Sequence, residues 1–83
     1  MKPRLSMPFN NEEKRVLLAI KGVGPTVIKR FEEIGINSLS ELKLYNVDEI
    51  TEMVAKMLNS TCWRNSPQAK AAINASIELA KNY

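Results

Sequence analysis

All three glycines of this chain lie between residues 22 and 35. Gly22-Val23-Gly24-Pro25 precedes, and Gly35-Ile36 follows, a stretch whose apolar residues recur at helical spacing: Val27, Ile28, Phe31 and Ile34. Pro25 suits the first position of a helix, and glycine suits the left-handed residue that ends one. This spacing predicts a helix over residues 25–34 with a tight turn directly ahead of it.

The turn has the features of an anion site. Two glycines leave the backbone uncovered just before a helix N-terminus, where unpaired N–H groups and the helix dipole both favour an anion. We expect Val23 to fill the space between the two flanking helices. A phosphate at this turn would be surrounded by the N–H groups of Gly22, Gly24 and Thr26, the Thr26 hydroxyl, and the side chains of Lys21, Lys29 and Arg30.

The rest of the chain predicts four more helices and no strand. The first spans residues 10–20, a short third begins at residue 38, the fourth spans residues 46–58, and the fifth begins at Ser66-Pro67. The first, third and fourth begin with a capping residue followed three positions later by glutamate, which is capping-box spacing: Asn10 and Glu13, Ser38 and Glu41, Asn46 and Glu49. The predicted fold class is an all-α bundle of about five short helices.

Apolar periodicity also predicts which side chains are buried. The fifth helix carries alanine, isoleucine and serine on one face. The fourth carries an apolar stripe made of Val47, Ile50, Met53, Val54, Met57 and Leu58. We expect both methionines in the core, Trp63 as a half-buried anchor between the last two helices, and Cys62 as a buried thiol.

Composition narrows the possible functions. The chain has 83 residues, one cysteine and no histidine, which excludes an internal disulfide and argues against a zinc site. No apolar run is long enough for a membrane span, and none follows the basic start as a signal peptide requires. We expect one cytoplasmic domain over residues 10–83, preceded by a flexible basic arm at residues 1–9, with no metal and no cofactor.

Charge is unevenly distributed along the chain. Residues 1–30 hold seven basic and two acidic side chains, residues 31–55 one basic and six acidic, and residues 56–83 four basic and one acidic. The two basic segments would give one basic face if folding brought them together. The alternative is that these charges merely solvate helix surfaces.

Residues 17–36, roughly a quarter of the chain, resemble the helix-hairpin-helix motif, with Lys21-Gly22-Val23-Gly24-Pro25 at its centre and Gly35-Ile36 at its end. The five-helix pattern is similar to the small SAM-like domains, stand-alone and bacterial in type, that carry this motif. The resemblance implies binding to the DNA backbone without sequence preference. Two positions depart from the family pattern: Thr26 stands where a basic residue is frequent, and Ile28 where a small residue is preferred.

The candidate phosphate site, taken with what this resemblance implies, predicts a non-specific DNA-binding module, accessory to a larger DNA-processing complex. It would contact phosphates through Lys21, Gly22, Val23, Gly24, Thr26, Lys29 and Arg30. The alternative is a SAM-like protein-interaction module that uses the acidic residues 41–52 or the surface around Trp63. An enzyme is disfavoured because the sequence offers no constellation of nucleophile, base and metal ligands.

Overall fold

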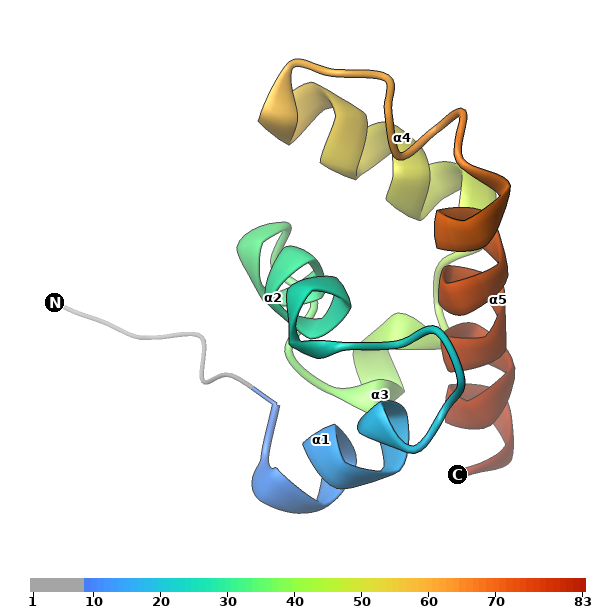
Figure 1. Cartoon of the computed structure of the whole chain (residues 1–83). Helices are drawn as coiled ribbons and strands as arrows, with labels where there is room; N and C mark the ends of the chain where they lie inside the picture. Colours follow the sequence, from blue (N-terminus) through green and yellow to red (C-terminus); the bar gives the residue numbers. More distant parts are fainter. Residues whose placement is uncertain (1–8) are drawn as a thin grey trace, which may run out of the picture.

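The computed structural model describes residues 9–83, which form five α-helices and no strand. In Figure 1 these helices form one compact bundle. They are α1 (Asn11–Leu18), α2 (Pro25–Glu33), α3 (Leu39–Leu42), α4 (Val47–Leu58) and α5 (Pro67–Asn82). The predicted all-helical class and the five elements are confirmed. The first helix ends two residues earlier than predicted, at Leu18.

Side-chain caps begin four of the helices. Asn10, Ser38, Asn46 and Ser66 each accept a hydrogen bond from the backbone N–H three residues on. The reciprocal bond of a capping box forms at Asn46 and Glu49. The other two predicted boxes are wrong, because their glutamates have other donors.

Glu13 and Glu41 are those two glutamates. Glu41 accepts from the N–H of Asn37, one residue before the cap. Glu13 accepts from the N–H of Leu39 at 3.1 Å and so supplies a second cap to α3 from a different helix. A carboxylate near a helix N-terminus also interacts favourably with the helix dipole.

The end of α2 is a Schellman motif. Gly35 has φ +92°, and the N–H of Ile36 donates to the Phe31 carbonyl at 2.8 Å, while the N–H of Gly35 donates to the Glu32 carbonyl. The predicted role of Gly35 as the left-handed residue after the helix is confirmed. Ile36 is thereby turned into the core, where it is fully buried.

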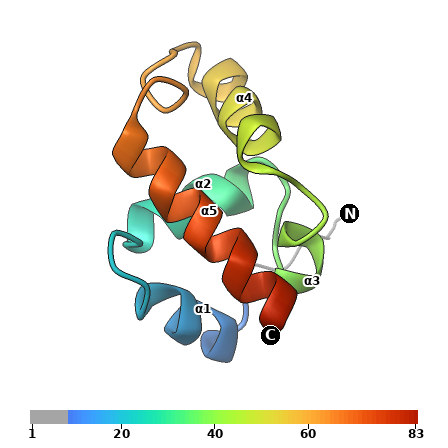
Figure 2. The ribbon, with the colours of Figure 1, turned by 90° about the vertical axis from the view of Figure 1, so that its right-hand side faces the viewer.

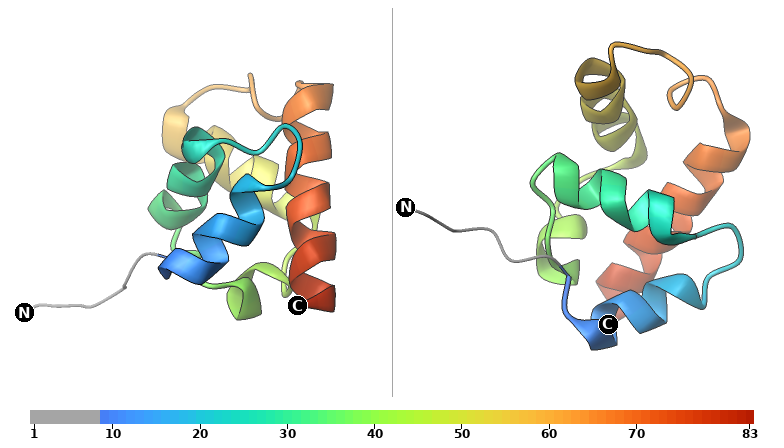
Figure 3. Two further views of the ribbon diagram at one scale, coloured as in Figure 1. Left: turned by 60° about the horizontal axis from the view of Figure 1, so that its bottom comes forward. Right: turned by 60° about the vertical axis from the view of Figure 1, so that its left-hand side comes forward.

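The core lies between α5 and the other four helices. α5 packs against α3 and α4, and α1 packs against α2. In Figure 2 α5 crosses in front of α2, and Figure 3 shows α1 and α2 running in opposite directions on either side of their connecting turn. Each of the five helices contributes buried side chains, among them Leu17, Phe31, Leu42, Ile50 and Ile73.

Phe9 belongs to this core, although the sequence analysis places it in the arm. Its side chain is 2% exposed, its ring centroid lies 6.3 Å from that of Phe31, and its N–H donates to a Glu32 carboxylate oxygen. The packed domain therefore begins at least one residue before the expected boundary. The rest of the predicted arm, residues 1–8, lies outside the described residues.

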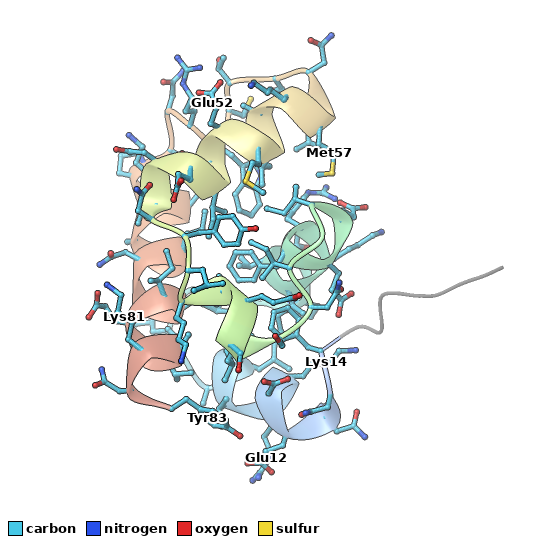
Figure 4. All side chains as sticks on the ribbon, turned by 180° about the vertical axis from the view of Figure 1, so that it is seen from behind. Glu12, Lys14, Glu52, Met57, Lys81 and Tyr83 are labelled. Carbon is cyan, nitrogen blue, oxygen red and sulfur yellow. The ribbon has the colours of Figure 1, made fainter. Side chains whose placement is uncertain are left out.

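The apolar stripe of α4 is only partly buried. Ile50 and Val54 are fully buried, but Met53 is half-buried and Met57 is 38% exposed. The prediction of Met57 as a core residue is wrong, because the last turn of α4 lies at the edge of the molecule (Figures 1 and 4). Thr51 is buried instead, and its hydroxyl donates to the Val47 carbonyl within the helix.

Candidate functional site

We define the glycine turn as residues 19–24, between α1 and α2. Ile20 accepts through its carbonyl from the N–H of Val23 at 3.0 Å, which closes the turn. Val23 is 6% exposed and belongs to the core, as predicted. Its burial fixes the turn against the helices, while Gly22 is exposed and Gly24 is half-buried.

Three backbone donors in and after the turn remain free. The N–H groups of Gly22, Gly24 and Thr26 donate no hydrogen bond to any acceptor within residues 9–83. Gly24 is the N-cap of α2 and, lacking a side chain, makes no side-chain cap. These are the three N–H groups predicted from the sequence to surround a phosphate. Those of Gly24 and Thr26 lie at the positive end of the nine-residue α2, and that of Gly22 lies in the turn two residues before the N-cap.

The two glycines of the turn differ in what they require. Gly22 has φ +92°, whereas Gly24 is extended with φ −115°. A side chain at Gly24 would therefore not be forced to positive φ, and the position at which a side chain would be strained is Gly22. A Cβ at Gly24 meets nothing within 4 Å, so the space above this part of the turn is open to a ligand.

The predicted basic side chains do not converge on one point. Lys29 is exposed and lines a groove between α1 and α2, whose other charged side chains are Lys14 and Glu32. Lys21 lines a different hollow, on the side of the turn that faces α5. The interface that the sequence describes as one cluster is thus divided between two sides of the turn.

Arg30 is committed elsewhere. Its guanidinium lies 2.6 Å from the Glu33 carboxylate, and its Nε is buried without a partner among the described residues. The Glu33 carboxylate partly neutralises the charge of the guanidinium, so Arg30 would attract a phosphate less strongly than an unpaired arginine. Lys14, Lys21 and Lys29, in contrast, form no ion pair with another residue of the described chain.

Lys14 is a residue that the sequence analysis missed. Figure 4 shows it on the side of α1 toward α2, away from Glu12. The signal was present, because Lys14 lies four residues before Leu18 and therefore shares its helix face. That face lines the groove next to Lys29.

The turn between α4 and α5 gives one confirmation and one correction. Trp63 is half-buried and packs against the core, as predicted. Cys62 is exposed, so the prediction of a buried thiol is wrong. The reason is local: residues 60–65 form a turn outside the bundle, which turns Trp63 inward and leaves its neighbour outside.

The acidic stretch has structural partners. Glu41 and Glu49 accept from backbone N–H groups at helix starts, and Glu52 pairs with Arg64 of the next turn at 3.3 Å. These bonds occupy three of the four acidic side chains in residues 41–52, namely all three glutamates. The stretch therefore stabilises helix ends and the connection to α5.

Within the described part of the chain, histidine, cysteine, aspartate and glutamate side chains form no group of three that would hold a metal ion. None of the helices of residues 9–83 has the length and apolar character needed to cross a membrane. Comparison with protein-family models, curated proteins and solved structures finds no match to this chain.

Proposed function

We propose that this protein is a non-sequence-specific DNA-binding module of the helix-hairpin-helix type, within a SAM-like arrangement of five helices. The glycine turn and the N-terminus of α2 would hold a backbone phosphate. The observation that carries the proposal is the set of three unpaired N–H groups, from Gly22, Gly24 and Thr26, beside an unobstructed Gly24. Oriented amides at a helix N-terminus favour a phosphate oxygen on both hydrogen-bonding and electrostatic grounds.

The free lysines support this assignment. Lys21 lies within the turn, and Lys14 and Lys29 line the adjacent groove, so a duplex backbone that crosses the turn would meet a lysine on either side. One turn makes few phosphate contacts. A role as an accessory module in a cytoplasmic DNA-processing complex, where another component supplies most of the affinity, fits this limited number.

Titration with a short DNA duplex tests the proposal. We expect binding at low ionic strength. The logarithm of the association constant should fall with the logarithm of salt concentration at a slope of about −2 to −4, for two to four phosphate contacts. Amide NMR shifts should be largest at the three free N–H groups. Folded protein that binds no duplex at low salt would favour the alternative, a protein-interaction module.

A variant at Gly24 tests the site itself. Gly24→Val places a branched side chain over the free N–H groups, and the extended backbone there accepts it without strain. We expect reduced affinity for duplex DNA with a circular dichroism spectrum like that of the parent. Parental affinity in the folded variant would mean that the phosphate does not bind at this turn.

A further inference from the structure

A hollow lies directly beside the glycine turn, on its α5 side. Its volume is about 750 Å³, within the range of small-molecule sites. Three parts of the chain form its walls: the turn, the first half of α5, and Trp63. Its lining includes Lys21, Gly22, Val27, Trp63, Gln68 and Ala71.

The hollow includes one of the three residues with a free backbone donor. This residue is Gly22, which lines the hollow and carries one of the three unpaired N–H groups. A Cβ at Gly22 would stand 3.9 Å from the Ala72 Cβ, which shows how closely the turn approaches α5. In Figure 1 the turn extends across the molecule toward that helix.

The lining has the chemistry of a nucleobase site. Its surface is mainly apolar, from alanines of α5 and Val27 of α2, and the half-buried Trp63 adds an aromatic wall. Base–aromatic stacking is favourable for every base, because each has a π-face. The charge at the rim comes from Lys21, which suits the phosphate next to such a base.

We propose that this hollow binds one unpaired nucleotide of a DNA strand, with the base against Trp63 and the alanines of α5 and the adjacent phosphate at the glycine turn. The inference rests on the proposed function and refines its substrate class. It selects DNA with single-stranded segments, frayed ends or overhangs over intact duplex, because a paired base is stacked within the duplex and cannot enter the hollow.

Two strands of equal charge test the inference on the unaltered protein. One is an oligothymidylate of about eight nucleotides, and the other is an abasic strand with the same number of phosphates. We expect the oligothymidylate to bind at least about fivefold tighter, which corresponds to one stacked base. Trp63 is the only tryptophan, so quenching of its fluorescence by the oligothymidylate but not by the abasic strand would report the contact.

A pair of variants locates the base. Ala71→Leu fills the hollow, whereas Asn74→Leu places the same side chain on an exposed position of α5 that does not line it. We expect Ala71→Leu to bind both strands equally and Asn74→Leu to keep the parental preference. Loss of the preference in both variants would contradict the location.

Equal binding of the two strands by the parent, or binding of blunt duplex alone, would overturn the inference and leave the proposed function intact. Absence of binding to any of the three DNAs at low salt would remove both.

Discussion

At the residue scale, alanine substitutions at Gly22 and Gly24 should differ in their effect on stability, although both residues lie in one turn. Gly22→Ala forces an alanine to φ +92° and should lower the free energy of unfolding by about 1–2 kcal/mol. Gly24→Ala should change it by less than about 0.5 kcal/mol, because the loss of a good N-cap residue and the lower entropy of the unfolded chain oppose each other. Urea denaturation of both variants measures this difference, and equal losses would contradict the assigned conformations.

Glu13 carries the second residue-scale prediction. It links α1 to α3 through the N–H of Leu39, so Glu13→Ala leaves that donor without its cap and should cost about 0.5–2 kcal/mol of stability. Glu12→Ala is the matched control, since Glu12 is exposed and pairs only with Arg15 on its own helix. A loss in the control as large as in Glu13→Ala would show that the cap contributes nothing.

The helix caps and Glu13 also show what the sequence can predict about single residues. The starts of four helices follow from local chemistry, because a capping side chain acts on a backbone group three residues away. The start of α2 follows from Pro25 at its first position. The partner of Glu13 does not follow from local chemistry, because Leu39 is 26 positions further along the chain and only tertiary folding brings it near.

At the scale of elements, the two basic side chains of α2 should contribute unequally to DNA affinity. Lys29→Ala should lower duplex affinity and reduce the salt slope by about 1, because Lys29 forms no ion pair within residues 9–83. Arg30→Ala should reduce the slope by less, since its guanidinium is already bound to Glu33. A variant with both substitutions should lose little more affinity and salt slope than Lys29→Ala alone.

The control for α2 is Lys43, which follows α3 in the acidic part of the chain. Lys43→Ala removes the same charge as Lys29→Ala and should leave both affinity and slope almost unchanged. The comparison is made by fluorescence titration at several salt concentrations. Equal losses in the two single variants would indicate attraction by net charge alone, without a defined interface.

Apolar periodicity predicted the helices themselves more accurately than it predicted which residues of each helix are buried. Helical spacing in residues 47–58 fixes α4 as a helix, but it contains no information on where the neighbouring helices end. Met57 continues the apolar stripe beyond the part that the bundle covers, while Thr51 is buried because its hydroxyl is satisfied inside the helix. For the candidate site, the sequence likewise supplied the free N–H groups but not the division of the lysines between two hollows.

At the scale of the whole molecule, the small core sets how much a single residue can matter. A domain of 83 residues has a typical free energy of unfolding of about 4–12 kcal/mol. Large buried side chains are few, and Phe9 is one of them despite lying outside every helix. Its packing next to Phe31 connects the beginning of the domain to the helix that follows the glycine turn.

Phe9→Ala should therefore cost about 3–5 kcal/mol, the usual loss for a buried phenylalanine, which is a large fraction of that free energy of unfolding. Leu44→Ala is the control, because Leu44 is 75% exposed and its truncation removes almost no buried surface. Thermal unfolding followed by circular dichroism distinguishes the two variants. The proposed phosphate site includes Gly24, the N-cap of α2, and exists only in the folded protein. Phe9→Ala should therefore also bind duplex DNA more weakly, in proportion to its unfolded fraction, and excess duplex should restore folding. An unfolding temperature equal to that of Leu44→Ala would mean that Phe9 lies outside the cooperative core.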